Sequence, residues 1–206
     1  MDDQRSSNRA RMIRARDSLR GNWGLAIGGV VIYMLVSFAV GVIPILGAIV
    51  SLLLAGAMSI GLAGFALALA RKAPTKISDI FAGFDRFGVG LGAYFFQGLF
   101  IVLWSLLLIV PGIIAALSYA MTYYVICEDQ HIGPLEAIAK SKNLMRGHKW
   151  ELFCLGFRFF GWILLCVLSL GLGFLWLIPY ILVTMAHFYD DIKQTTTEST
   201  APIVAT

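Results

Sequence analysis

The chain has 206 residues, of which 59% are hydrophobic and 14% charged, and its formal net charge is +4. A soluble domain carries roughly 25% charged residues. The mean hydropathy of +0.81 arises from long uncharged runs, which the remaining polar residues are too few to cover in water. Composition therefore excludes an ordinary soluble domain and predicts an integral membrane protein.

The basic residues gather at the edges of the apolar runs. Attraction to anionic lipid and the positive-inside bias explain this placement, and no aromatic-and-basic motif for nucleic acid accompanies it. We therefore expect anionic phospholipids of the inner leaflet as partners, with other membrane proteins or a second copy beside them, and no nucleic acid. The groups are Arg5, Arg9, Arg11, Arg14, Arg16 and Arg20; Arg71, Lys72, Lys76 and Arg86; and Lys140, Lys142, Arg146 and Lys149.

Residues 1–22 form a basic cytoplasmic segment. Met12, Ala15 and Leu19 follow at steps of three and four, which predicts an amphipathic helix in the headgroup region. The alternative is a flexible basic tail that only sets the topology. From residue 23 to 70 the chain is uncharged and is interrupted at Pro44, so it is long enough for a hairpin of two membrane-spanning helices.

A second and a third hairpin follow the same plan. Residues 71–90 predict a short interfacial helix, and residues 91–127 a hairpin that turns at Pro111. Residues 128–149 predict a helix that starts near Pro134 and ends near Gly147. The last hairpin covers about 152–189, and we expect residues 190–206 to be a disordered cytoplasmic tail.

The fold class is therefore all-α. Residues 23–189 form a polytopic bundle of six transmembrane helices in three hairpins, each preceded by a short amphipathic interfacial helix. The turns carry no charge and the basic groups lie between hairpins, so both termini are expected in the cytoplasm. Similar motifs at Arg20, Arg86 and Arg146 suggest an internal repeat, with coincidence among hydrophobic strings as the alternative. Shallow re-entrant hairpins are a second alternative to full spans.

A few polar residues are candidates for function. Arg158 is the sharpest, since a charge within an apolar run is costly, although it lies within snorkelling reach of the interface and has Glu151 as a candidate partner. Gln97 is a weaker candidate. The cluster of Glu128, Asp129 and His131 could be an acid-base or metal site, but a polar loop at a helix end is the commoner use.

The remaining predictions concern binding and chemistry. We expect no catalytic residue, metal or cofactor, since no catalytic motif is present and the three cysteines are odd in number and widely spaced. The basic residues expected to contact lipid headgroups are Arg9, Arg16, Arg20, Lys72, Arg86, Lys140 and Arg146.

The central stretch from Pro111 to Trp150 carries a resemblance. Its pattern PGIIAALSYAMTYYVICED, followed by GPLEAIAKSKNLMRGHKWELF and the closing Pro179-Tyr180, resembles the bacterial membrane family catalogued as domain of unknown function 975. The likeness extends over nearly the whole chain up to about Tyr189. That family is similar to the membrane domain attached to some glycerophosphodiester phosphodiesterases. The resemblance implies a protein of the bacterial cytoplasmic membrane without catalytic residues to transfer, and Arg158 departs from the expected apolar pattern.

The favoured function is a non-enzymatic membrane protein that interacts with lipids or partner proteins. A small transporter or export accessory protein is the alternative, with Arg158, Gln97 and the Glu128 cluster as its path. A lipid-modifying enzyme is a third class. A polar cavity from Glu128 toward Gln97 would favour transport, whereas an apolar lateral groove would favour the lipid or partner role.

Overall fold

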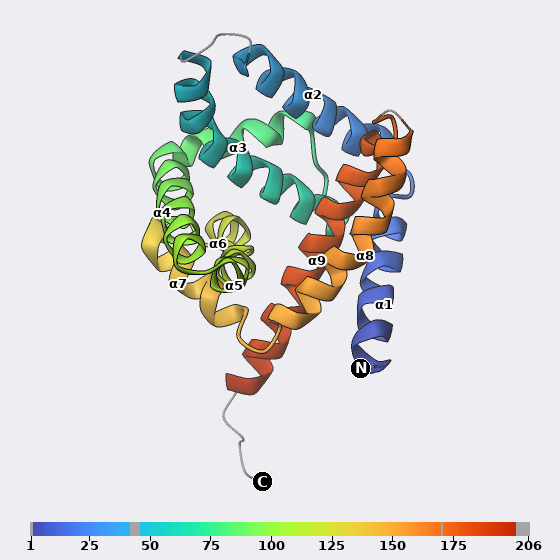
Figure 1. Cartoon of the computed structure of the whole chain (residues 1–206). Coiled ribbons are helices and arrows are strands. Elements are labelled where there is room, and N and C mark those ends of the chain that lie inside the picture. Colours follow the sequence, from blue (N-terminus) through green and yellow to red (C-terminus); the bar gives the residue numbers. More distant parts are fainter. Residues whose placement is uncertain (1, 42–45, 170, 201–206) are drawn as a thin grey trace.

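The structure is a computed structural model that describes residues 2–41, 46–169 and 171–200, and within these ranges it contains helices and no strand. The all-α prediction is thus confirmed (Figure 1). The elements are α1 (Asp2–Leu19), α2 (Trp23–Gly41), α3 (Leu46–Ala70), the 3₁₀ helix η1 (Ile77–Arg86), α4 (Phe87–Leu107), α5 (Ile109–Tyr119), α6 (Thr122–Glu128), α7 (Pro134–Leu144), α8 (Lys149–Leu168) and α9 (Phe174–Thr200).

Within the described ranges, four helical segments are long and apolar enough to cross a membrane. A fifth is counted if Ser7–Leu19 and Trp23–Phe38, which meet at 96°, form one bent span. Neither α2 alone nor α9 passes this test, so length and composition support four to five spans where the sequence analysis predicts six. The four segments are Val50–Ala70, Ile77–Leu107, Ile109–Glu128 and Lys149–Leu168.

The helices form two groups joined through α3. In Figure 1, α4 to α7 gather on one side of the molecule and α1, α8 and α9 on the other, while α3 runs between them beneath α2. Helix α3 packs against η1, α4, α6 and α9. Its inward side chains, among them Phe65, Ala66 and Leu69, are nearly inaccessible to solvent and form the centre of the core.

The contact between α3 and η1 depends on glycine. A Cβ atom on Gly61 would overlap the carbonyl oxygen of Ile80, and one on Gly83 would overlap the carbonyl oxygen of Ala57. The two backbones therefore touch directly, and the side chain of Ile80 is completely buried. One face of the segment that we expected to be an amphipathic interfacial helix packs on α3, while its Phe81 and Phe84 are exposed. Its place at the membrane interface stays a prediction.

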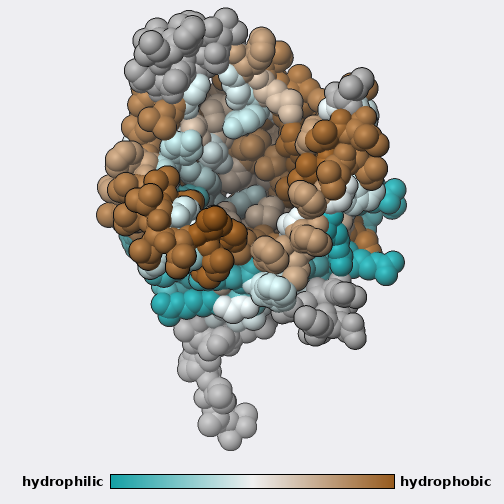
Figure 2. Space-filling view, viewed as in Figure 1, coloured by the Kyte–Doolittle hydropathy of each residue, from teal (hydrophilic) through white to brown (hydrophobic). Residues whose placement is uncertain are grey.

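The outer surface is strongly apolar away from one edge. Leu106 at the end of α4 is 84% exposed and Leu168 at the end of α8 is 83% exposed. Figure 2 shows hydrophobic surface over α4 and α5 and hydrophilic residues gathered along the opposite, lower edge of this face. Large exposed apolar areas are rare on soluble monomers, so the surface fits a protein surrounded by lipid.

Several boundaries differ from those expected. The apolar run 112–127 is divided into α5 and α6, and the turn near Pro111 falls at Leu108, which has an extended backbone and precedes α5. The prediction of a disordered tail is wrong for residues 190–200, because α9 continues to Thr200. Residues 201–206 and the turn at Pro44 lie outside the described ranges.

We predict that Gly61→Ala destabilises the protein, because the new methyl group would force α3 and η1 apart. Overpacking of this kind typically costs about 1–3 kcal/mol. Thermal unfolding in mild detergent measures the effect as a lower midpoint temperature. Gly98→Ala is the matched control, since nothing lies within 4 Å of its added Cβ. Equal midpoints for both variants would contradict the close packing.

Candidate membrane-interface site

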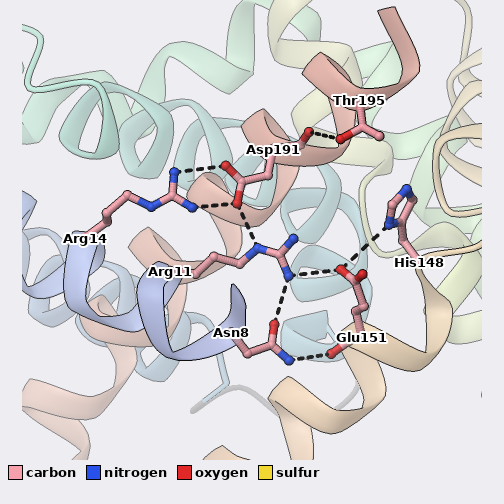
Figure 3. A network of polar contacts seen from close by, with 7 residues as sticks. All are labelled: Asn8, Arg11, Arg14, His148, Glu151, Asp191 and Thr195. Atoms are coloured by element: carbon pink, nitrogen blue, oxygen red, sulfur yellow. Dashed lines mark hydrogen bonds and ion pairs between the residues drawn. The ribbon is translucent and has the colours of Figure 1, made fainter. Parts of the chain in front are cut away.

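The N-terminal helix is fastened to the last two helices by Arg11. Its Nε donates to Oδ2 of Asp191 at 2.8 Å, and its Nη1 donates to Glu151 Oε2 at 3.1 Å and to Asn8 Oδ1 at 2.8 Å. The guanidinium also lies 4.6 Å from the ring centroid of Phe188. Arg11 is only 5% exposed, and this buried charge is compensated by two carboxylates (Figure 3). The aromatic face of Phe188 adds to this compensation.

Neighbouring residues complete this network. Arg14 donates to both oxygens of Asp191, at 3.0 and 2.6 Å, and Asn8 Nδ2 donates to the backbone oxygen of Glu151 at 3.2 Å. His148 Nδ1 lies 3.7 Å from Glu151 Oε2. Figure 3 shows α1, α8 and α9 meeting at these side chains. Residues far apart in sequence therefore fix the position of α1 along the α8/α9 pair.

A second network joins the ends of α3 and α6 to the middle of α9. Arg71 pairs with Glu128 and Asp190, and Lys193 pairs with the other oxygen of Glu128. Tyr189 Oη donates to Glu128 Oε2 at 2.7 Å. Glu128 thus accepts from three donors and joins α6 to α9 and to the end of α3. The proton or metal chemistry considered from the sequence stays a prediction.

The other members of that cluster lie in a loop. Asp129 accepts from the backbone N–H of His131 at 3.2 Å and from Lys140 Nζ at 3.4 Å, while the His131 side chain is exposed. The pKa of Asp129 lies below its ordinary value, chiefly because of the hydrogen bond from the His131 backbone. Among the described residues, no group of three or more His, Cys, Asp or Glu side chains could hold a metal ion.

Arg86 has an internal role in place of the headgroup contact that we expected. Its guanidinium donates to the carbonyl oxygens of Ile126 at 2.6 Å, Asp129 at 2.7 Å and Ile132 at 3.0 Å. These carbonyls belong to the end of α6 and the loop after it, where the helix leaves them without intrahelical partners. Arg86 therefore caps α6 and ties it to η1.

Arg158 and Gln97 also differ from expectation. The polar contact of Arg158 is with Met12 Sδ at 3.9 Å, and its expected partner Glu151 is bound to Arg11. The Oε1 atom of Gln97 is buried and, within the described part of the chain, has no hydrogen-bond partner. None of the contacts described above joins Arg158 or Gln97 to the cluster around Glu128.

A groove opens between the start of α2 and the α8/α9 pair. It has a volume of about 590 Å³ and its walls are mostly apolar and aromatic. Arg16 is its one charged lining residue. The lining consists of Arg16, Trp23, Trp162, Leu165, Cys166, Ser169, Gly173, Trp176, Leu177 and Tyr180.

The remaining predicted headgroup residues are exposed on the surface. Lys140 pairs with Asp129 and Arg20 with Asp17, at 3.4 Å in both cases. None of these contacts tests lipid binding, so it stays a prediction. The other exposed members are Arg9, Arg16, Lys72 and Arg146.

Sequence reasoning missed the network around Arg11. A signal was present, because Arg11, Ala15 and Leu19 are spaced by four residues and all three are buried. Asn8 lies one turn earlier on the same face. An arginine and an asparagine on the apolar stripe of α1 therefore indicated a buried polar contact, although not its partners 140 and 180 residues away.

Apolar outer helices and polar networks that hold their ends define the class as a helical bundle of the kind found in membranes. The family model described as "Protein of unknown function (DUF975)" matches residues 106–196, from the end of α4 into α9. This match confirms the resemblance to that family over the segment. The similarity to the phosphodiesterase membrane domain stays a prediction. No curated protein and no solved structure matches the chain.

The acid stability of the protein should depend on Asp191. Burial raises the pKa of Asp191, but hydrogen bonds from Arg14 and Arg11 outweigh it, so the pKa lies below its ordinary value. The stability contributed by Asp191 is therefore complete above about pH 4, the ordinary aspartate pKa, and is lost as the pH falls through the lower value in the folded protein. Thermal unfolding of Asp191→Asn should show a lower midpoint at pH 7 and a smaller further loss in acid. Asp17→Asn, at an exposed surface pair, serves as control.

Replacing Arg86 by Gln should destabilise the α6 end, because up to three carbonyl oxygens lose a charged donor. Each buried group left unsatisfied typically costs about 1–3 kcal/mol. The measurement is the midpoint of thermal unfolding in detergent, compared with Arg146→Gln, which removes an exposed arginine. If Arg86 only contacted lipid headgroups, the two variants would unfold alike in lipid-free detergent.

Proposed function

We propose that the chain is a non-enzymatic, multi-pass protein of the bacterial cytoplasmic membrane that binds anionic lipids of the inner leaflet or a partner membrane protein. The observation that carries this proposal is the separation of the surface into an apolar exterior and polar networks at one set of helix ends. Glu128, Glu151 and Asp191 lie in these networks, whereas Leu106 and Leu168 lie at the opposite helix ends.

In the proposed arrangement, the helices form three hairpins, and the connection between the second and the third hairpin lies on the inner side. The pairs are α2/α3, α4 with α5–α6, and α8/α9. The turn at Leu108 and the turn at residues 169–173 carry no charge, while the segments between hairpins carry the lysines and arginines. The positive-inside rule then assigns both termini to the cytoplasm.

Transport is the second candidate, and one observation favours it. Within the described residues, the buried Oε1 atom of Gln97 has no hydrogen-bond partner and lies in a mostly apolar helix. A polar group in this position is expected along the path of a polar substrate. A pocket of about 880 Å³ also lies beside Arg86, Asp79 and His131, but its lining includes neither Glu128 nor Gln97. The apolar groove beside α8 and α9 fits the lipid or partner role better.

Single-cysteine labelling tests the proposed topology. The native Cys127, Cys154 and Cys166 are replaced by Ala, and one cysteine is introduced at Leu108, Leu172 or Asn143. A membrane-impermeant maleimide added to intact cells should label Leu108→Cys and Leu172→Cys. Asn143→Cys, on α7 between the second and third hairpins, should react only after the membrane is permeabilised.

Labelling from outside at Asn143→Cys would refute the cytoplasmic assignment of the connections. Protection of both hairpin ends in intact cells, with reaction after permeabilisation, would instead indicate re-entrant hairpins. Solubilised protein serves as the control for intrinsic reactivity at each position.

A further inference from the structure

Two guanidinium groups lie beside the α8/α9 pair without a carboxylate partner among the described residues. Arg11 and Arg14, which precede Arg16 on α1, are paired with acids. Arg16 has no such pair, and Arg158 has only the sulfur of Met12 at 3.9 Å. Arg158 contacts Met12, whose backbone oxygen accepts from Tyr180 Oη at 3.1 Å, and Tyr180 lines the same groove as Arg16. The two positive charges are therefore directed at one region.

The position of these charges makes an anion favourable there. Arg158 lies about 12 Å along α8 from Trp150, at roughly 1.5 Å per residue. In the proposed orientation, Arg158 lies deeper in the membrane than the paired acids Glu151 and Asp191. A charge at that depth in lipid is costly unless it is paired or hydrated. The described part of the chain supplies no carboxylate to either group, so an anion from outside the chain would lower this cost.

The surroundings select an amphiphile rather than a small ion. The groove that Arg16 lines is walled by Trp162 and Leu165 of α8, Trp176 of α9 and Trp23 of α2. Trp162 and Trp176 are more than half exposed, at 53% and 56%. Aromatic and aliphatic walls next to a guanidinium match a negatively charged head joined to hydrocarbon chains.

We propose that this groove binds one anionic glycerophospholipid, with its phosphate between Arg16 and Arg158 and an acyl chain along the tryptophans. The site rests on the proposed function, because lipid reaches it only if the α8/α9 pair lies in the membrane. It deepens that function by naming the ligand class and the residues that hold it. Free phosphate would leave the apolar walls unused, and a zwitterionic lipid would bring a cationic ammonium group next to the two guanidinium groups.

Tryptophan quenching by brominated lipids tests the proposal. Trp104 and Trp150, which do not line the groove, are replaced by Phe, so that emission comes from Trp23, Trp162 and Trp176. The protein is reconstituted in phosphatidylcholine vesicles with an increasing fraction of phosphatidylglycerol brominated on its acyl chains. Brominated phosphatidylcholine at the same fractions gives the quenching by non-selective contact.

We expect quenching to saturate at a lower fraction of brominated phosphatidylglycerol than of brominated phosphatidylcholine. Arg16→Gln or Arg158→Gln should weaken the apparent affinity for the anionic lipid about tenfold, the effect of losing one charge-assisted contact. Arg9→Gln removes the same charge from an exposed position of α1 outside the groove and should change it little. Arg16→Lys should retain part of the preference.

Each other outcome overturns a defined claim. Equal curves for the two brominated lipids, or equal losses in Arg9→Gln and Arg16→Gln, would refute the site while leaving the membrane assignment intact. Displacement of the lipid by millimolar glycerol phosphate would show that the chains contribute nothing. No quenching by either lipid would refute the proposed function itself.

Discussion

The constraint on which the structure depends is the lack of polar surface along most of its helices. Side chains at the ends of α4 and α8 are more than four-fifths exposed although they are leucines. Such a surface is unfavourable in water and suits a lipid surrounding. Charged residues are costly in that surrounding, so they are not spread over this surface. They are concentrated where helices end, and there they pair with one another.

The ion pairs between charged residues hold separate helices together, which a simple membrane anchor would not do. Arg11 and Arg14 reach acids at the beginning of α8 and in the polar part of α9, so the first helix is held by the last two. Arg71 does the same for α3, α6 and α9. In a low-dielectric surrounding these contacts are stronger than on a water-exposed surface, provided that every charge has its partner.

The requirement that every charge has a partner also identifies the residues that differ from the rest. Arg86 is satisfied by backbone carbonyls, and Arg11 by carboxylates and an aromatic ring. Arg16 and Arg158 are the guanidinium groups beside the apolar groove that the described part of the chain does not neutralise. In the proposed site, a lipid phosphate would supply the counter-charge by the same electrostatic rule that orders the rest of the polar residues.

The sequence predicted those features that depend on local pattern. Helix α7 begins with Pro134 in its first turn and the chain after it turns at Gly147 with a positive φ, because both residues prefer these conformations wherever they occur. It could not predict contacts between distant residues. Nothing near Arg86 indicates that three carbonyls 40 to 46 residues away would accept from it. Likewise, the polar tail after Lys193 has a disordered composition, yet α9 continues as far as Thr200.

The central claim is that lipid surrounds the apolar helices. Extraction of cell membranes with alkaline sodium carbonate tests it most directly, because this treatment removes proteins held only by charge and leaves those whose apolar surface is in the bilayer. The account predicts that the full chain remains in the membrane pellet together with a known integral protein. Release of the chain into the supernatant, with that marker retained, would contradict it.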